Sequence, residues 1–132
     1  MAFSEKYVKR LASLEKAYGK LENCQTLKLN NDVLVEVVTK RFEYTFESLW
    51  KTIKTYLLEM KGIDCSSPMD CFKSAFQERL IPPDYENIFI DIIRTRNEIV
   101  HIYDEDAAKT VYGKIVSDYI DAIGLVVENL KK

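Results

Sequence analysis

Residues that interrupt helices are scarce in this chain, and this scarcity most limits the folds open to it. The chain has only four glycines and three prolines in 132 residues. The three prolines and Gly62 fall in two segments, residues 61–68 and 80–84. Between these segments apolar residues recur every three or four positions, which is the spacing of one face of an α-helix. The pattern therefore predicts helices joined by short connections.

We expect five helices, at about residues 4–24, 33–61, 68–79, 84–100 and 105–132. The second would be roughly 40–45 Å long. Residues that favour helix ends support these limits: Asn30, Asn31 or Asp32, then Ser67 with Pro68, then Asp84 as N-terminal caps, and Gly62 as a C-terminal stop. Long helices with short connections predict an all-α, antiparallel up-and-down four-helix bundle with one short extra helix. The length predicts one domain over residues 1–132.

Composition excludes several classes of protein. Apolar residues make up 47% and charged residues 30%, which is typical of a globular chain. The net charge of −2 and a pI near 5.5 argue against broad nucleic-acid binding, so the basic residues of the first helix are expected to form an ordinary solvated face. No apolar run reaches the roughly 18 residues of a membrane helix, and no signal-peptide core is present at the N-terminus. We therefore expect a cytoplasmic protein.

The three cysteines, Cys24, Cys65 and Cys71, are odd in number and cannot all pair within the chain. Reduced thiols that behave as small apolar groups are the simplest interpretation. The cysteines lack the spacing of metal ligands, and the chain has a single histidine. We therefore expect no metal site and no cofactor.

The single histidine lies in the octet Arg96-Asn97-Glu98-Ile99-Val100-His101-Ile102-Tyr103. An imidazole moves protons near neutral pH, and a guanidinium holds anionic oxygens, so the pair suits phosphate-ester chemistry. On an ideal helix Arg96 falls in the middle of the core-facing sector, which also includes Val100. Asn97 and His101 fall with Ile90 on a separate, semi-polar face. This second face is a candidate for contact with another chain.

The octet also has simpler interpretations. A guanidinium on an apolar face must be paired, and Glu43 or Glu47 of the second helix could supply the carboxylate. His101 could interact only with the last carbonyls of its helix. Arg96 and His101 point about 140° apart on an ideal helix. They could act on one phosphate only if the helix ends near His101 or if two copies of the octet meet across a symmetric interface.

The form R-x-x-x-x-H-x-Y, with Asn97 after the arginine, resembles the HEPN superfamily of helical bundles. A second segment, residues 41–51, is similar to the long-helix signature of the bacterial nucleotidyltransferase substrate-binding proteins within that superfamily. One departure is visible: this family often has a tryptophan ahead of the Arg-Asn pair, where the chain has Ile88 and Phe89. The resemblance covers nearly the whole chain.

The resemblance implies a toxin of a toxin–antitoxin pair that acts as a dimeric, metal-independent RNA endonuclease. It implies catalytic roles for Arg96, Asn97 and His101, with a minimal nucleotidyltransferase as partner and regulator. In the best-matching relatives that partner modifies the tyrosine of the motif with AMP, which corresponds here to Tyr103. Glu43 and Glu47 are candidate partner contacts. A second hypothesis stays open: a non-catalytic nucleotide- or substrate-binding subunit of a two-component nucleotidyltransferase.

Overall fold

The computed structural model describes residues 3–102 and 104–132, and all regular structure in these residues is helical. The α-helices are α1 (Glu5–Asn23), α2 (Asn31–Lys61), α3 (Pro68–Gln77), α4 (Glu86–Glu98), α5 (Glu105–Lys114) and α6 (Ile120–Leu130). Short 3₁₀ turns cover Cys24–Thr26, Pro83–Tyr85 and Ile99–His101, and a π-helical turn, Ile115–Tyr119, joins α5 to α6. None of the helices in this part of the chain is long and apolar enough to cross a membrane.

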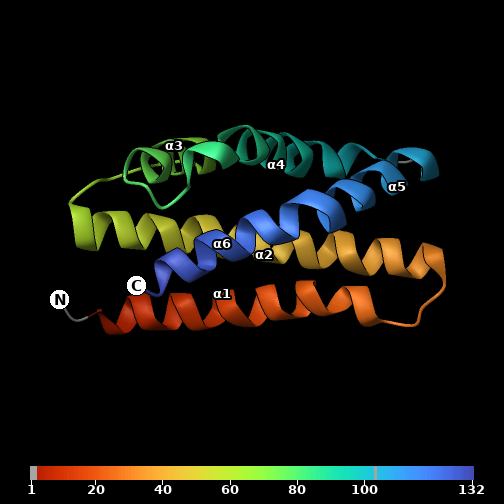
Figure 1. Ribbon diagram of the computed structural model, residues 1–132, viewed down its shortest axis with the longest axis horizontal. Helices are drawn as coiled ribbons and strands as arrows, with labels where there is room; N and C mark the ends of the chain where they lie inside the picture. Colours follow the sequence, from red (N-terminus) through yellow and green to blue (C-terminus); the bar gives the residue numbers. More distant parts are fainter. Residues whose placement is uncertain (1–2, 103) are drawn as a thin grey trace.

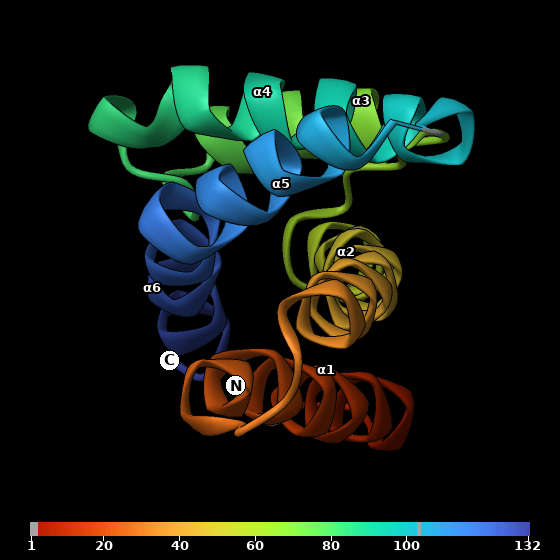
Figure 2. The ribbon, with the colours of Figure 1, turned by 90° about the vertical axis from the view of Figure 1, so that its right-hand side faces the viewer.

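The helices run alternately in opposite directions along one long axis (Figure 1). α1 and α2 lie side by side and antiparallel, α4 returns above them, and α5 with α6 descends diagonally back towards α1 (Figures 1 and 2). α3 is the short extra helix and packs beside α4 and α2. The predicted all-α up-and-down bundle with one short extra helix is confirmed.

Aromatic side chains connect the helices through the core. Phe46 of α2 meets the edge of Phe72 of α3 with ring centroids 5.7 Å apart, and Phe72 meets Phe89 of α4 at 5.4 Å. Phe42 stacks on Tyr119 of the π-turn at 5.6 Å. Such pairs add about 0.5–1.5 kcal/mol each beyond the area they bury. The buried aromatic cluster therefore fixes α4 against α2, and it supports the helix that contains the octet.

Two predicted helix ends are confirmed, and one is wrong. Gly62 ends α2 with a left-handed φ of 67°, and Ser67 Oγ accepts the backbone N–H of Asp70 at 3.2 Å to cap α3. Asp84 does not cap α4, because it lies within the 3₁₀ turn Pro83–Tyr85 and the helix begins only at Glu86.

The last predicted helix is continuous in sequence pattern but is divided in the structure. The π-turn Ile115–Tyr119 is wider than the α-helical turns of α5 and α6 on either side of it. The turn positions the Tyr119 hydroxyl to bond Asp91, and this hydroxyl also lies 2.8 Å from Thr95 Oγ1. These tertiary contacts from α4 stabilise a local geometry that periodicity alone does not predict.

The prediction of three reduced cysteines is wrong. Cys65 and Cys71 form a disulfide, with their Cα atoms 5.2 Å apart, and Cys24 is free and buried. The chain reverses after Gly62, which brings the connection to α3 back against the first turns of α3. The odd count allowed one pair, and this local reversal selects which two cysteines form it.

Candidate functional site

The octet lies where α4 ends. α4 stops at Glu98, and Ile99–His101 continues as a 3₁₀ turn, so each residue advances about 120° instead of 100°. Val100 was expected in the core sector, and this is wrong: the tighter turn rotates it outwards, and it is 64% exposed. Asn97 and His101 are also exposed, whereas Arg96 is half-buried.

Arg96 makes three contacts that fix its guanidinium. Its Nη2 forms an ion pair with Glu47 Oε1 on α2, and Nη1 donates to Asn97 Oδ1 at 3.3 Å. The guanidinium carbon lies 5.1 Å from the centroid of the Phe46 ring. The predicted pairing with the second helix is confirmed, and the structure selects Glu47 rather than Glu43. A cation held over an aromatic face by a carboxylate is pre-oriented to receive an anion.

Glu47 is shared between side chains that the sequence did not connect. Its second oxygen, Oε2, accepts the indole N–H of Trp50 at 3.2 Å, and Lys51 Nζ lies 3.9 Å from the same atom. Trp50 itself packs against the core. The i,i+3 spacing of Glu47 and Trp50 was the signal available in the sequence. Glu47 therefore acts as a positioning residue for Arg96.

Glu43 lies one turn earlier on α2 and borders a different feature. It lines a hollow of about 230 Å³ beside the octet. The other lining residues are Glu36, Thr39, Lys40, Ile99, Ile102 and Ala108. In the described part of the chain, no cation lies within ion-pair distance of Glu43. The hollow opens between α2 and the turn that holds His101.

The structure does not bring His101 and Arg96 together within one chain. Arg96 turns towards α2, while the exposed His101 imidazole makes no hydrogen bond to any described residue. Tyr103, the expected modified residue, lies outside the described residues. Across residues 3–102 and 104–132, no three His, Cys, Asp or Glu side chains gather as metal ligands do.

A polar cluster behind the octet was missed by sequence reasoning. Tyr119 donates to Asp91 and pairs with Thr95, and Lys114 Nζ lies 3.6 Å from Asp91 Oδ2. Burial, followed by the hydrogen bond to Asp91, raises the pKa of the Tyr119 phenol well above its usual value. The i,i+4 spacing of Asp91 and Thr95 was the only local signal. This cluster anchors the middle of α4, just before Arg96.

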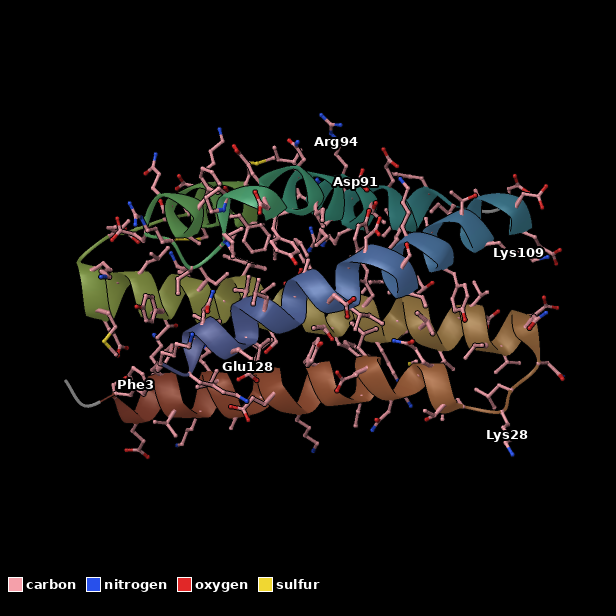
Figure 3. All side chains as sticks on the ribbon, viewed as in Figure 1. Phe3, Lys28, Asp91, Arg94, Lys109 and Glu128 are labelled. Atoms are coloured by element: carbon pink, nitrogen blue, oxygen red, sulfur yellow. A yellow bond between two sulfur atoms is a disulfide. The ribbon has the colours of Figure 1, made fainter. Side chains whose placement is uncertain are left out.

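The outer face of α4 carries Ile90, Arg94, Asn97 and His101. Arg94 points away from the bundle (Figure 3). Ile90 borders an apolar groove of about 450 Å³ between α3 and α4, together with Met69, Phe72, Phe76, Ile81 and Phe89. The semi-polar face predicted from the helical wheel is therefore continuous with an apolar groove.

Solved structures with this fold were found in two bacteria. One is a crystal structure of a protein from Thermus thermophilus, with 28% identity and a TM-score of 0.82 over 90% of this chain and 99% of that one. The other is the HEPN toxin of Shewanella oneidensis, tri-AMPylated and in complex with MNT antitoxin, with a TM-score of 0.76. It is 14% identical and 98% of each chain is covered, so this likeness concerns the fold. No curated protein matches the chain.

These comparisons place the molecule among helical bundles of the HEPN fold, as the octet predicted. Residues 5–132 match the family described as nucleotidyltransferase substrate binding protein like, and the chain belongs to that family.

Proposed function

We propose that this protein is the toxin of a HEPN toxin–antitoxin pair: a metal-independent RNA endonuclease that acts as a dimer. The observation that carries the proposal is the Arg96 guanidinium, held by Glu47 over Phe46 at the end of α4 and five residues from the exposed His101. The family membership supports it, as does the fold shared with the Shewanella oneidensis toxin.

The chemistry follows from the residue types. The His101 imidazole removes the proton from an RNA 2′-hydroxyl, and the resulting oxygen attacks the adjacent phosphorus. The Arg96 guanidinium stabilises the charge that builds on the phosphate oxygens, and Asn97 orients Arg96 or the phosphate. The bond to the 5′-oxygen breaks, and that oxygen takes a proton from an acid. The products are a 2′,3′-cyclic phosphate and a 5′-hydroxyl.

A dimer supplies what one chain lacks. Each chain has a single imidazole, and cleavage needs both a base and an acid. A two-fold axis beside the outer face of α4 would bring His101 of one copy towards Arg96 of the other. The apolar groove next to Ile90 gives such an interface buried area. We therefore propose that the outer face of α4, with Asn97 and His101, lies at the interface.

The proposed regulator is a cognate minimal nucleotidyltransferase, which would attach AMP to Tyr103. The added phosphate and nucleoside would compete with RNA for Arg96. Glu43 and Glu47 remain the proposed partner contacts. Of the two, Glu43 is better placed, because both oxygens of Glu47 already accept hydrogen bonds. Mass spectrometry after incubation with partner and ATP tests the modification, with Tyr103→Phe as the control.

The second candidate is a non-catalytic subunit that presents nucleotide or substrate to a nucleotidyltransferase. The description of its family favours this candidate, and so does the hollow of about 230 Å³ beside the octet, which is large enough for part of a nucleotide. A cytoplasmic location is proposed for both candidates. There, reducing conditions would keep Cys65 and Cys71 as thiols.

RNA cleavage by the purified protein in EDTA tests the proposal. Wild-type protein should cut RNA, His101→Ala should abolish cutting, and Glu98→Ala, an exposed change on the same turn, should leave it intact. Expression of the wild-type chain alone should arrest growth, and expression of His101→Ala should not. Cleavage that survives in both His101→Ala and Arg96→Ala would reject the endonuclease and leave the binding subunit.

A further inference from the structure

The charges on α1 are separated into two flanks. Five basic residues fall within about 120° of the helix circumference: Lys6, Lys9, Arg10, Lys16 and Lys20. Glu15 and Glu22 lie on the other flank, where they line a hollow with Asp121 and Glu128 of the last helix. The overall net charge of −2 therefore conceals a basic flank, which faces α2.

The basic flank meets α2 across a hollow of about 200 Å³. Its lining residues are Ser13, Lys16, Ala17 and Lys20 of α1 with Arg41 and Tyr44 of α2. Small side chains thus leave space between cations, and no described lining residue is acidic. Arg41 Nη1 donates to the Lys20 carbonyl at 2.7 Å, which fixes the guanidinium at the edge of the hollow. Cations around a recess with no carboxylate favour a bound anion.

Tyr44 adds an aromatic surface to these cations. Its side chain is among the most exposed large apolar groups of the chain, at 61%, and Lys40 Nζ lies 5.5 Å from its ring centroid. An exposed ring beside lysines costs apolar exposure without any packing gain, so a ligand with a flat face would explain its position. Nucleobases stack on such rings, and the neighbouring cations hold the phosphates.

Lys40 connects this hollow to the octet. It also lines the second hollow, whose walls include Ile99 and Ile102 on either side of His101 in the chain. Glu36 and Glu43 line this second hollow, so it suits the hydrogen-bond donors of a base rather than a phosphate. A strand held at Lys16 and Lys20 and stacked on Tyr44 would reach the octet along one surface of α2.

We propose that the surface formed by Lys16, Lys20, Arg41, Lys40 and Tyr44 binds single-stranded RNA. The phosphates lie against the basic flank of α1, and one base stacks on Tyr44. This inference rests on the proposed endonuclease function and adds a substrate-binding surface to it. The alternative occupant, an acidic protein partner, would use the cations but would not need the exposed ring.

Binding is measured on the His101→Ala protein, which cannot cut, by fluorescence anisotropy with a labelled single-stranded RNA of about 12 nucleotides. Added Lys16→Glu and Lys20→Glu should weaken binding at least about tenfold and reduce the slope of log K against log salt by about one. Tyr44→Ala should weaken binding about tenfold with little change in that slope, and Tyr44→Phe should restore it. Lys28→Glu with Lys132→Glu is the control for an equal charge change at exposed positions. Circular dichroism confirms that each variant is folded.

Cleavage by the same variants with His101 intact separates the two proposals. If wild-type protein cuts RNA while the Lys16/Lys20 and Tyr44 variants bind and cut like the control, the binding surface is wrong and the endonuclease stands. If wild-type protein binds RNA through these residues but never cuts it, the surface stands and the endonuclease fails. If RNA binding is unaffected but the Lys16/Lys20 variant loses the nucleotidyltransferase partner, the surface binds protein and the RNA proposal is overturned.

Discussion

The contact between Arg96 and Glu47 gives a quantitative prediction, because its parts can be estimated separately. A buried pair broken on one side would cost about 3–5 kcal/mol. Here the Arg96 and Glu47 side chains are 37% and 36% exposed, so the ion pair contributes only about 0.5–1 kcal/mol. The contact with Phe46 adds about 0.5–1 kcal/mol. We therefore expect Arg96→Ala to lower the free energy of unfolding by about 1–2 kcal/mol.

A double-mutant cycle isolates the ion pair from the other contacts. Arg96→Ala, Glu47→Ala and the double variant are compared with wild type by urea unfolding and by thermal melting. The coupling energy should be about 0.5–1 kcal/mol, and it should shrink in about 1 M salt, which screens half-exposed charges. For a chain of this length, Arg96→Ala should lower Tm by roughly 3–10 °C. His101→Ala, at an exposed position, should stay within about 0.5 kcal/mol of wild type.

The cycle also bears on function. If Glu47 positions Arg96, Glu47→Ala should reduce RNA cleavage, whereas Glu47→Gln, which keeps both hydrogen-bond acceptance and shape in part, should retain more activity. Arg96→Ala should lose about 10²–10³-fold. A coupling energy of zero, with Glu47→Ala as active as wild type, would refute the positioning role. Arg96 would then be oriented by Asn97 and Phe46 alone.

Three further outcomes are expected. Ser67→Ala removes the side-chain cap of α3 and should cost about 1 kcal/mol, while Ser66→Ala, beside it in the connection, should cost less; equal effects would refute the cap. Reduction of the Cys65–Cys71 disulfide should destabilise the protein by roughly 2 kcal/mol and lower Tm, and the Cys65→Ser/Cys71→Ser variant should melt identically with and without reductant. Burial and the bond to Asp91 raise the pKa of Tyr119, so its neutral form stabilises the fold below about pH 10, and this stability is lost as pH rises beyond that value. Tyrosinate absorbance should show Tyr119 ionising only with unfolding, and ionisation alongside the exposed tyrosines in folded protein would contradict the buried contact.

The octet shows how far a pattern reaches. Its residue types predicted a phosphate-directed arginine and histidine, and the helical wheel placed Arg96 inwards and Asn97 with His101 outwards, as the structure has them. The wheel failed at Val100, because it assumes one helical period throughout and α4 changes to a tighter turn after Glu98. A change of period at a helix end depends on the connection that follows.

Choices between equivalent partners were beyond the sequence. Glu43 and Glu47 lie on the same face of α2, and both could reach a cation on α4. The position of Phe46 beneath the guanidinium and of Trp50 beside the carboxylate selects Glu47. The basic surface around Tyr44 was also hidden, since composition averages charges that α1 separates onto two flanks.

The sequence by itself determined the helices, their order, the bundle and the residues of the octet, because periodicity and helix-ending residues act over a few neighbouring positions. Tertiary structure decided the π-turn that brings Tyr119 to Asp91, the Cys65–Cys71 pair, the partner of Arg96 and the hollow between α1 and α2. Each of these depends on how two elements meet, and packing between elements far apart in the chain sets that geometry.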